Sequence, residues 1–244
     1  MPRKTYLSIH PKRQPSARTP RTPRTPTSGL LLVLAITIAA WGSLLPGCNI
    51  LGPALYLAHG PEKIKQLVEL DKERPVVIFL DDRAGVIRNA RLRDAITTTA
   101  SQELLDHEVV DHVIDSKAVA AVVSHEPRSD LLPISVIGQK VNADIVIYVE
   151  PEVFTLSPDN QTYIPTAKFE VKIIDAQDDS RIWPDKPEGY TFSVSAHTKQ
   201  GAPPSSASAR NQAEQEFAVF VGQRLAQMFY SHEKTSASDS RTHK

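Results

Sequence analysis

Cys48 is the only cysteine of this 244-residue chain, and it directly follows Leu45, Pro46 and Gly47 at the end of an apolar run that begins at Leu30. Residues 1–47 carry seven Lys or Arg and no Asp or Glu. A basic leader, an apolar stretch that is short for a bilayer span, and small residues before a cysteine are together typical of a bacterial lipoprotein signal. The pattern predicts cleavage after Gly47 and acylation of Cys48, with palmitate or a related fatty acid as the anchor. An uncleaved signal anchor built from the same apolar segment is the alternative.

The basic leader hides the charge of the rest of the chain. The sequence has 28 Lys or Arg and 28 Asp or Glu, so the part from Cys48 onward carries 21 basic and 28 acidic residues, a formal charge of −7. Affinity for nucleic acid rests largely on clustered basic side chains, so this acidic part is a poor candidate for binding it. A lone cysteine also excludes an intramolecular disulfide. Asn49, which follows the cysteine, favours the periplasmic side of the outer membrane, by analogy with bacteria that sort lipoproteins on this residue.

Asp81 and Asp82 are the strongest candidates for an enzymatic site. They follow a short apolar run that is predicted to be a buried strand, and ligands of open α/β sheets gather beyond the carboxyl ends of strands. Two acids there could hold Mg²⁺ and support phosphoryl transfer. However, successive residues of an extended segment point to opposite sides, and no glycine-rich phosphate loop accompanies the pair. We therefore interpret them as turn acids that cap a loop or pair with Arg83, Arg91 or Arg93.

Other chemical patterns in the chain are incomplete. His107, His112 and His125 lack the spacing of a zinc site, and the sequence has neither a His-Glu-x-x-His motif nor a cysteine pair. No Gly-x-Ser-x-Gly element for a serine nucleophile is present. The stretch 160–162 matches a glycosylation acceptor but is better explained as a hairpin tip. We expect no catalytic residue, no metal site and no cofactor.

The spacing of apolar residues predicts the elements that would position these groups. A stripe with a period of about four residues indicates an amphipathic helix, a continuous apolar run a buried strand, and strict alternation a strand with one wet face. Asp115 or Ser116, and one residue of 205–208, are candidate helix caps. The predicted helices are 61–73, 89–107, 117–123, 134–141 and about 208–231, and the predicted strands are 75–80, 109–114, 145–150, 168–173 and 190–197.

These elements predict one α/β domain that leans towards α+β, with a mixed central sheet, a C-terminal antiparallel meander, helices packed on the sheet and a long C-terminal helix. Residues 1–47 form the predicted signal peptide with its long basic, proline-rich leader, and 48–60 form the lipid-anchored tether. Residues 61–231 form the globular domain, and 232–244 a disordered tail.

The order of the predicted elements resembles that of a group of envelope lipoproteins. The group includes the penicillin-binding-protein activator LpoB, the curli-secretion lipoprotein CsgG and the N-terminal domain of TolB. The resemblance covers about residues 75–230, with 76–82 starting the sheet and 142–148 matching the group's entry of Ala-Asp into an apolar strand. It implies action by binding or assembly, and it transfers no catalytic residue.

The leading hypothesis is a lipid-anchored, periplasm-facing envelope protein that acts without catalysis, as an accessory of another envelope protein, which it would bind through a sheet edge or the proline-rich loop 150–168. The alternative is an oligomeric subunit of an envelope secretion or transport assembly. A self-assembling pore is disfavoured because Pro151, Pro158 and Pro165 interrupt the only insertion long enough to build barrel strands. The third hypothesis is an enzyme that uses Asp81 and Asp82 with a divalent metal.

Overall fold

Residues 76–175 alternate strands and helices in the order that the sequence predicts. The structure is a computed structural model that describes residues 63–126, 131–196 and 201–233, so Cys48 and the predicted signal lie outside the described residues. The elements in chain order are β1 (Lys63–Ile64), β2 (Val76–Leu80), α3 (Ala90–Asp106), β3 (Val113–Ile114), α4 (Ser116–Ser124), α5 (Ile134–Lys140), β4 (Ile145–Thr155), β5 (Thr166–Asp175), β6 (Ser180–Trp183), β7 (Tyr190–Ser195), α6 (Ala207–Ala226) and β8 (His232–Glu233).

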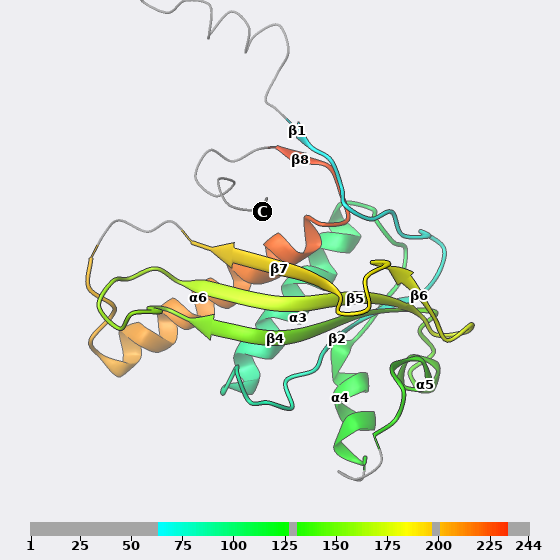
Figure 1. Ribbon diagram of the computed structural model, residues 1–244, viewed down its shortest axis with the longest axis horizontal. Coiled ribbons are helices and arrows are strands. Elements are labelled where there is room, and N and C mark those ends of the chain that lie inside the picture. The colour runs from blue at the N-terminus through cyan, green and yellow to red at the C-terminus, as the bar shows by residue number, and fades with distance from the viewer. Residues whose placement is uncertain (1–62, 127–130, 197–200, 234–244) are drawn as a thin grey trace, which may run out of the picture. The chain divides into compact units, whose positions relative to one another are not determined.

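The main sheet has six strands in the order β3-β2-β4-β5-β6, and β7 pairs with β5 as well (Figure 1). β2 is parallel to β3 and β4, whereas β4, β6 and β7 are all antiparallel to β5. β7 lies along residues 166–171 of β5, and β6 lies along residues 173–175. This mixed sheet with an antiparallel C-terminal part confirms the predicted α+β class.

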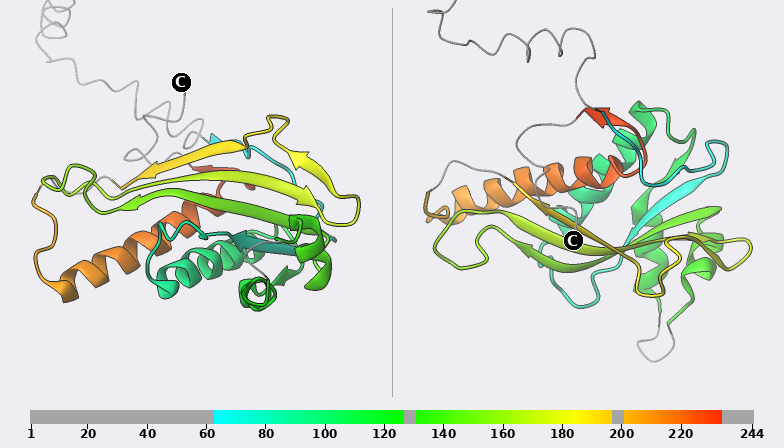
Figure 2. Two further views of the ribbon diagram at one scale, coloured as in Figure 1. Left: turned by 60° about the horizontal axis from the view of Figure 1, so that its bottom comes forward. Right: turned by 45° about the horizontal axis from the view of Figure 1, so that its top comes forward.

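Helices cover one face of this sheet and only part of the other. Ile78 of β2 and Phe169 of β5 belong to a core that α3 and α6 close, and Figure 2 shows these helices along one side of the sheet. Phe79 and Val146 point to the opposite face and pack against α4 and α5. Beyond β2 and the first half of β4, this second face carries charged side chains. Side chains alternate between the two faces of a strand, so the apolar residues between these charged ones point into the core. The charged residues are Glu150, Glu152, Lys168, Glu170 and Lys172.

Three helices begin at a side chain that caps them, and for α4 and α6 the cap lies where the sequence predicts one. The side chain of Asn89 accepts a hydrogen bond from Arg91 N–H at the start of α3, and Asp115 accepts one from Lys117 N–H at the start of α4. Ser206 accepts one from Ala209 N–H at the start of α6. Each cap satisfies a backbone donor that has no partner within its own helix.

The predicted helix over 61–73 is wrong for the residues that the structure describes. Ile64 lies in β1, and the chain runs without helix from there to β2. The N–H groups of Leu67 and Val68 both donate to the carbonyl oxygen of Met228, while Leu67 is 49% exposed and Leu70 is buried. Contacts with the C-terminal segment therefore override a spacing that suits a helix.

Four other boundaries differ from the prediction. β3 is confined to residues 113–114, because Glu108 has a φ of 52° and the chain is still turning out of α3 at Val109. β4 continues to Thr155, so much of the expected loop 150–168 is strand. The short strand β6 is an addition. α6 ends at Ala226, and residues 232–233, expected to be disordered, pair with β1 instead.

α3 and α6 approach each other closely at Gly222. A Cβ added to this residue would lie 2.6 Å from the carbonyl oxygen of Ile96 and 2.8 Å from Cβ of Thr99. Real Cβ atoms do not approach backbone so closely, so Gly222 is required by the distance between the helices and not by its own dihedral angles.

Replacing Gly222 with Ala tests this contact. In an unconstrained helix the change would stabilise by up to about 1 kcal/mol, because Ala loses less entropy than Gly. Here we expect a loss of about 1 to 3 kcal/mol in the free energy of unfolding, because α3 and α6 must move apart. Urea denaturation measures this, and Gln223→Ala on the exposed side of α6 is the matched control. A stabilised Gly222→Ala variant would contradict the close packing.

Candidate functional site

The side chain of Asp82 is buried beyond the carboxyl end of β2 and organises the loop that follows. Its Oδ1 accepts a hydrogen bond from Val86 N–H at 2.7 Å, and its Oδ2 accepts one from Ile87 N–H at 3.0 Å. Nη1 of Arg93 lies 3.2 Å from the same Oδ2. The side chain is only 2% exposed, so these three donors supply the polar contacts that burial of a carboxylate demands.

Asp81 faces the opposite side, as the alternation along a strand requires. Its Oδ2 accepts a hydrogen bond from the Tyr148 hydroxyl at 3.0 Å, and its Oδ1 lies 3.3 Å from Nε of Arg83. The same guanidinium donates to Glu126 at 3.1 Å, and Glu126 also accepts a hydrogen bond from Leu132 N–H at 3.3 Å. A single arginine thus links two buried carboxylates, with 7% and 3% exposed side chains, across the ends of β2 and α4.

Tyr148 acts in this network as a hydrogen-bond donor. Burial raises the pKa of its hydroxyl far above the ordinary value of a tyrosine, and the nearby carboxylates of Asp81 and Glu150 raise that pKa further. The hydroxyl therefore stays protonated throughout the neutral range, and its O–H donates a hydrogen bond to Asp81.

These contacts place Asp81 and Asp82 on separate sides of the strand, each with its own arginine. The predicted pairing with Arg83 and Arg93 is confirmed, and Asp82 also caps the loop as predicted. A metal ion bound by both acids would have to displace these partners and reach across the strand. The arrangement stabilises the chain locally, and it does not bring the two carboxylates together.

His107, His112 and His125 make different contacts, and the backbone carbonyl of His112 accepts a hydrogen bond from Val76 N–H at 3.0 Å. His107 stacks on Tyr230 with ring centroids 3.8 Å apart, and its Nε2 lies 3.5 Å from Glu103. Nδ1 of His125 lies 2.7 Å from the carbonyl oxygen of Ala121. Within residues 63–126, 131–196 and 201–233, no group of three or more His, Cys, Asp or Glu could hold a metal ion.

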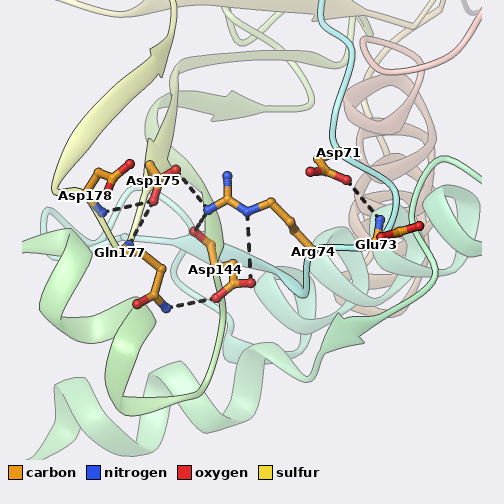
Figure 3. A network of polar contacts seen from close by, with 7 residues as sticks. All are labelled: Asp71, Glu73, Arg74, Asp144, Asp175, Gln177 and Asp178. Atoms are coloured by element: carbon orange, nitrogen blue, oxygen red, sulfur yellow. Dashed lines mark hydrogen bonds and ion pairs between the residues drawn. The ribbon is translucent and has the colours of Figure 1, made fainter.

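A second polar network, partly buried and missed from the sequence, surrounds Arg74 (Figure 3). Its guanidinium lies 2.9 Å from Asp175 at the end of β5 and donates to the carbonyl oxygen of Asp144 just before β4. Burial raises the pKa of Asp175, but amide hydrogen bonds from Asp178 and Gln177 and the Arg74 charge outweigh it, and the pKa is lowered. Arg74 therefore joins the ends of two antiparallel strands to the segment before β2.

A cleft of about 540 Å³ lies where α3 begins, β4 ends and α6 begins. Leu92, Phe154 and Leu156 contribute apolar surface to it, and Arg88 and Arg210 contribute charge. The sequence did not indicate this site, because its walls come from three segments that are far apart in the chain.

The outer edge of β7 is free among the described strands, because β7 pairs only with β5. Ala196 N–H donates to Pro165 on the β5 side at 2.9 Å, and bonding residues alternate in an antiparallel pair. It follows that Thr191, Ser193 and Ser195 direct their N–H and C=O groups away from β5. Charged residues, prolines and bulges commonly protect such an edge from pairing with another chain. β7 contains none of these three features.

Comparison with known proteins gives a resemblance of fold alone. No protein-family model matches the chain, and no curated protein matches it. Among solved structures, the PelC dodecamer from Paraburkholderia phytofirmans is 11% identical, with 68% of this chain and 95% of that chain covered and a TM-score of 0.36. The LpoB C-terminal domain from Salmonella enterica is 12% identical, with 60% and 92% covered and a TM-score of 0.32.

TolB from Acinetobacter baumannii is 10% identical, with 68% of this chain and 30% of that chain covered and a TM-score of 0.27. The chain therefore resembles LpoB and TolB weakly at the level of fold, as the order of elements predicted. At these scores the likeness says nothing about function. In the described part of the chain, no helix is both long and apolar enough to cross a membrane.

Removing the Asp82 carboxylate tests its role in the loop. We expect Asp82→Ala to lower the free energy of unfolding by about 2 to 4 kcal/mol, because two amide donors and Arg93 lose their acceptor. Asp82→Asn, which keeps one acceptor oxygen, should lose less. Urea denaturation measures both, and Asp94→Ala, at an exposed position of α3, should change stability by less than about 0.5 kcal/mol. An Asp82→Ala variant as stable as this control would refute the structural role.

Proposed function

We propose that this chain is a lipid-anchored, non-enzymatic protein of the bacterial cell envelope. It faces the periplasm, and it binds another envelope protein by pairing an extended segment of that partner with the free edge of β7. The observation that carries the proposal is this edge, where backbone donors and acceptors of an uncharged strand have no partner among the described residues. Strand addition to such an edge supplies affinity through main-chain hydrogen bonds.

The chemistry of the side chains supports binding over catalysis. Asp81 and Asp82 are each committed to an arginine and to other donors, and they lie on different sides of β2. The anchor rests on Cys48 and the residues before it, which form the pattern of a lipoprotein signal. Asn49 supports the outer membrane as the destination by the sorting analogy.

The alternative is an oligomeric subunit of an envelope secretion or transport assembly, in which the same edge pairs with a second copy of this chain. A two-fold axis would place β7 against β7 in an antiparallel pair, because such an interface uses the same surface of both copies. The two functions differ in what occupies the edge.

Cys48→Ala tests the anchor. We expect the variant to lose incorporation of labelled palmitate and to leave the membrane fraction, because the thiol is the acceptor for the acyl group. Asn49→Gln, which keeps the cysteine, should retain the label. Cell fractionation and autoradiography measure both effects. Labelling of Cys48→Ala at the wild-type level would refute the lipidation of Cys48.

Ser193→Pro tests the edge. Its amide points away from β5, so proline removes an outward donor without breaking the β5–β7 ladder. We expect crosslinking to the partner in intact cells to fall about tenfold or more, since one lost backbone bond and the steric block cost over 1.4 kcal/mol. Circular dichroism should show that the fold is retained, and Ser193→Ala is the matched control with its amide intact.

The crosslinked product distinguishes the two functions. A product that joins this chain to a different envelope protein, present in wild type and Ser193→Ala and lost in Ser193→Pro, supports the accessory role. A product made of copies of this chain, together with the mass of a dimer or a larger oligomer in light scattering of residues 49–244, would support the assembly subunit instead. Crosslinking that Ser193→Pro leaves intact would exclude the β7 edge as the docking site.

A further inference from the structure

The cleft between α3, β4 and α6 carries two arginines that no described carboxylate neutralises. Arg88 and Arg210 are both exposed, and within residues 63–126, 131–196 and 201–233 neither has an ion pair within 4.0 Å. By contrast, Arg74, Arg83 and Arg93 are each held by carboxylates. The two arginines therefore have donors available for a ligand.

The backbone adds positive potential to the same cleft. Asn89 caps α3 at one wall, Arg210 lies in the first turn of α6 at another, and neither helix has an acidic residue in its first turn. The N-terminal end of a helix carries a partial positive charge, and acids in the first turn are the usual local counterweight. The one acid among the lining residues is Glu214, a turn further along α6.

Apolar side chains complete the cleft. Leu92 is 5% exposed and Leu156 is 8% exposed, so the floor belongs to the core, and Phe154 packs on Phe217 with ring centroids 5.1 Å apart. A volume of about 540 Å³ is that of a small-molecule site. Apolar walls with positive charge at one side suit a ligand that has an apolar part and an anionic group.

We propose that this cleft binds an anionic amphiphile, a molecule with a phosphate or carboxylate group held by Arg88 and Arg210 and a short apolar chain against Leu92 and Leu156. The guanidinium fork matches the geometry of both anions and forms strong, charge-assisted hydrogen bonds to them. Nucleic acid does not fit, because the part of the chain from Cys48 onward is acidic and the cleft is too small for an extended polyanion. This site is separate from the β7 edge, so it stands independently of the proposed function.

Calorimetric titration of the full chain in a nonionic detergent tests the proposal, with hexyl phosphate as the probe. We expect saturable binding that is at least about tenfold tighter than that of inorganic phosphate, because burying the apolar chain adds free energy. Hexanoate is the second probe: equal or tighter binding of hexanoate identifies a carboxylate ligand, and tighter binding of hexyl phosphate identifies a phosphate. Hexyltrimethylammonium, with the same chain and the opposite charge, should not bind.

Variants of the lining assign the binding to this cleft. Arg88→Gln and Arg210→Gln should each weaken the binding of hexyl phosphate about tenfold, and Glu214→Gln should strengthen it severalfold by removing a like charge. Arg91→Gln, an exposed arginine of α3 outside the lining, is the control and should bind as wild type. Thermal unfolding verifies that each variant is folded. If one arginine variant does not fold, the binding of hexyl phosphate to the other arginine variant decides the test.

Three results would overturn the proposal. One is the absence of saturable binding for both hexyl phosphate and hexanoate. Another is hexyltrimethylammonium that binds as tightly as the anions, which would show that the apolar surface acts without the charge. The third is wild-type affinity in folded Arg88→Gln and Arg210→Gln variants, which would place the ligand elsewhere.

Discussion

Helices cover only part of the second face of the sheet, and this incomplete cover determines which strands are apolar on both sides and which carry polar side chains on the surface. α4 and α5 cover β2, the first half of β4 and the end of β5 at Ile174, so β2 and the first half of β4 are apolar on both sides, whereas buried and more exposed positions alternate along the rest of β5 and along β7. The long antiparallel part must then be stabilised from one side by α3 and α6, which explains why those helices pack as closely as Gly222 permits. It also leaves an open polar face that ends in the unpaired edge of β7.

The sequence predicted this fold well wherever local signals and tertiary contacts agree. α3, α4 and α6 have both a periodic stripe and a capping side chain, α5 directly follows Pro133, and β7 shows clear alternation. The failures lie where a distant contact decides. Residues 65–70 have helical spacing but are held by Met228, and the end of β4 is strand because β5 pairs with it across Pro151, where the register shifts. Local patterns carry no information about such partners.

The same reasoning explains what could be predicted of the sites. Asp81 and Asp82 were found because adjacent acids after a strand are visible in one segment, and their pairing with nearby arginines followed from proximity in the chain. The cleft beside Arg88 and Arg210 and the network around Arg74 each join segments over 60 residues apart. Whether an arginine is neutralised or available is decided by those long-range contacts, so composition and net charge could not separate Arg88 from Arg83.

The pairing of β1 with β8 has a mechanical consequence. Lys63 pairs with Glu233 and Ile64 with His232, so the two strands are antiparallel and the first described residue lies beside the last. If Cys48 is anchored, tension from the membrane passes along the chain and reaches Lys63 before any other described residue. A pull there opens the β1–β8 pairing one residue pair at a time, first at Lys63 and then at Ile64. Only then does it act on the contact of Leu67 and Val68 with Met228. The short ribbon would thus yield at low force and lengthen the tether, while the sheet that carries the β7 edge stays folded.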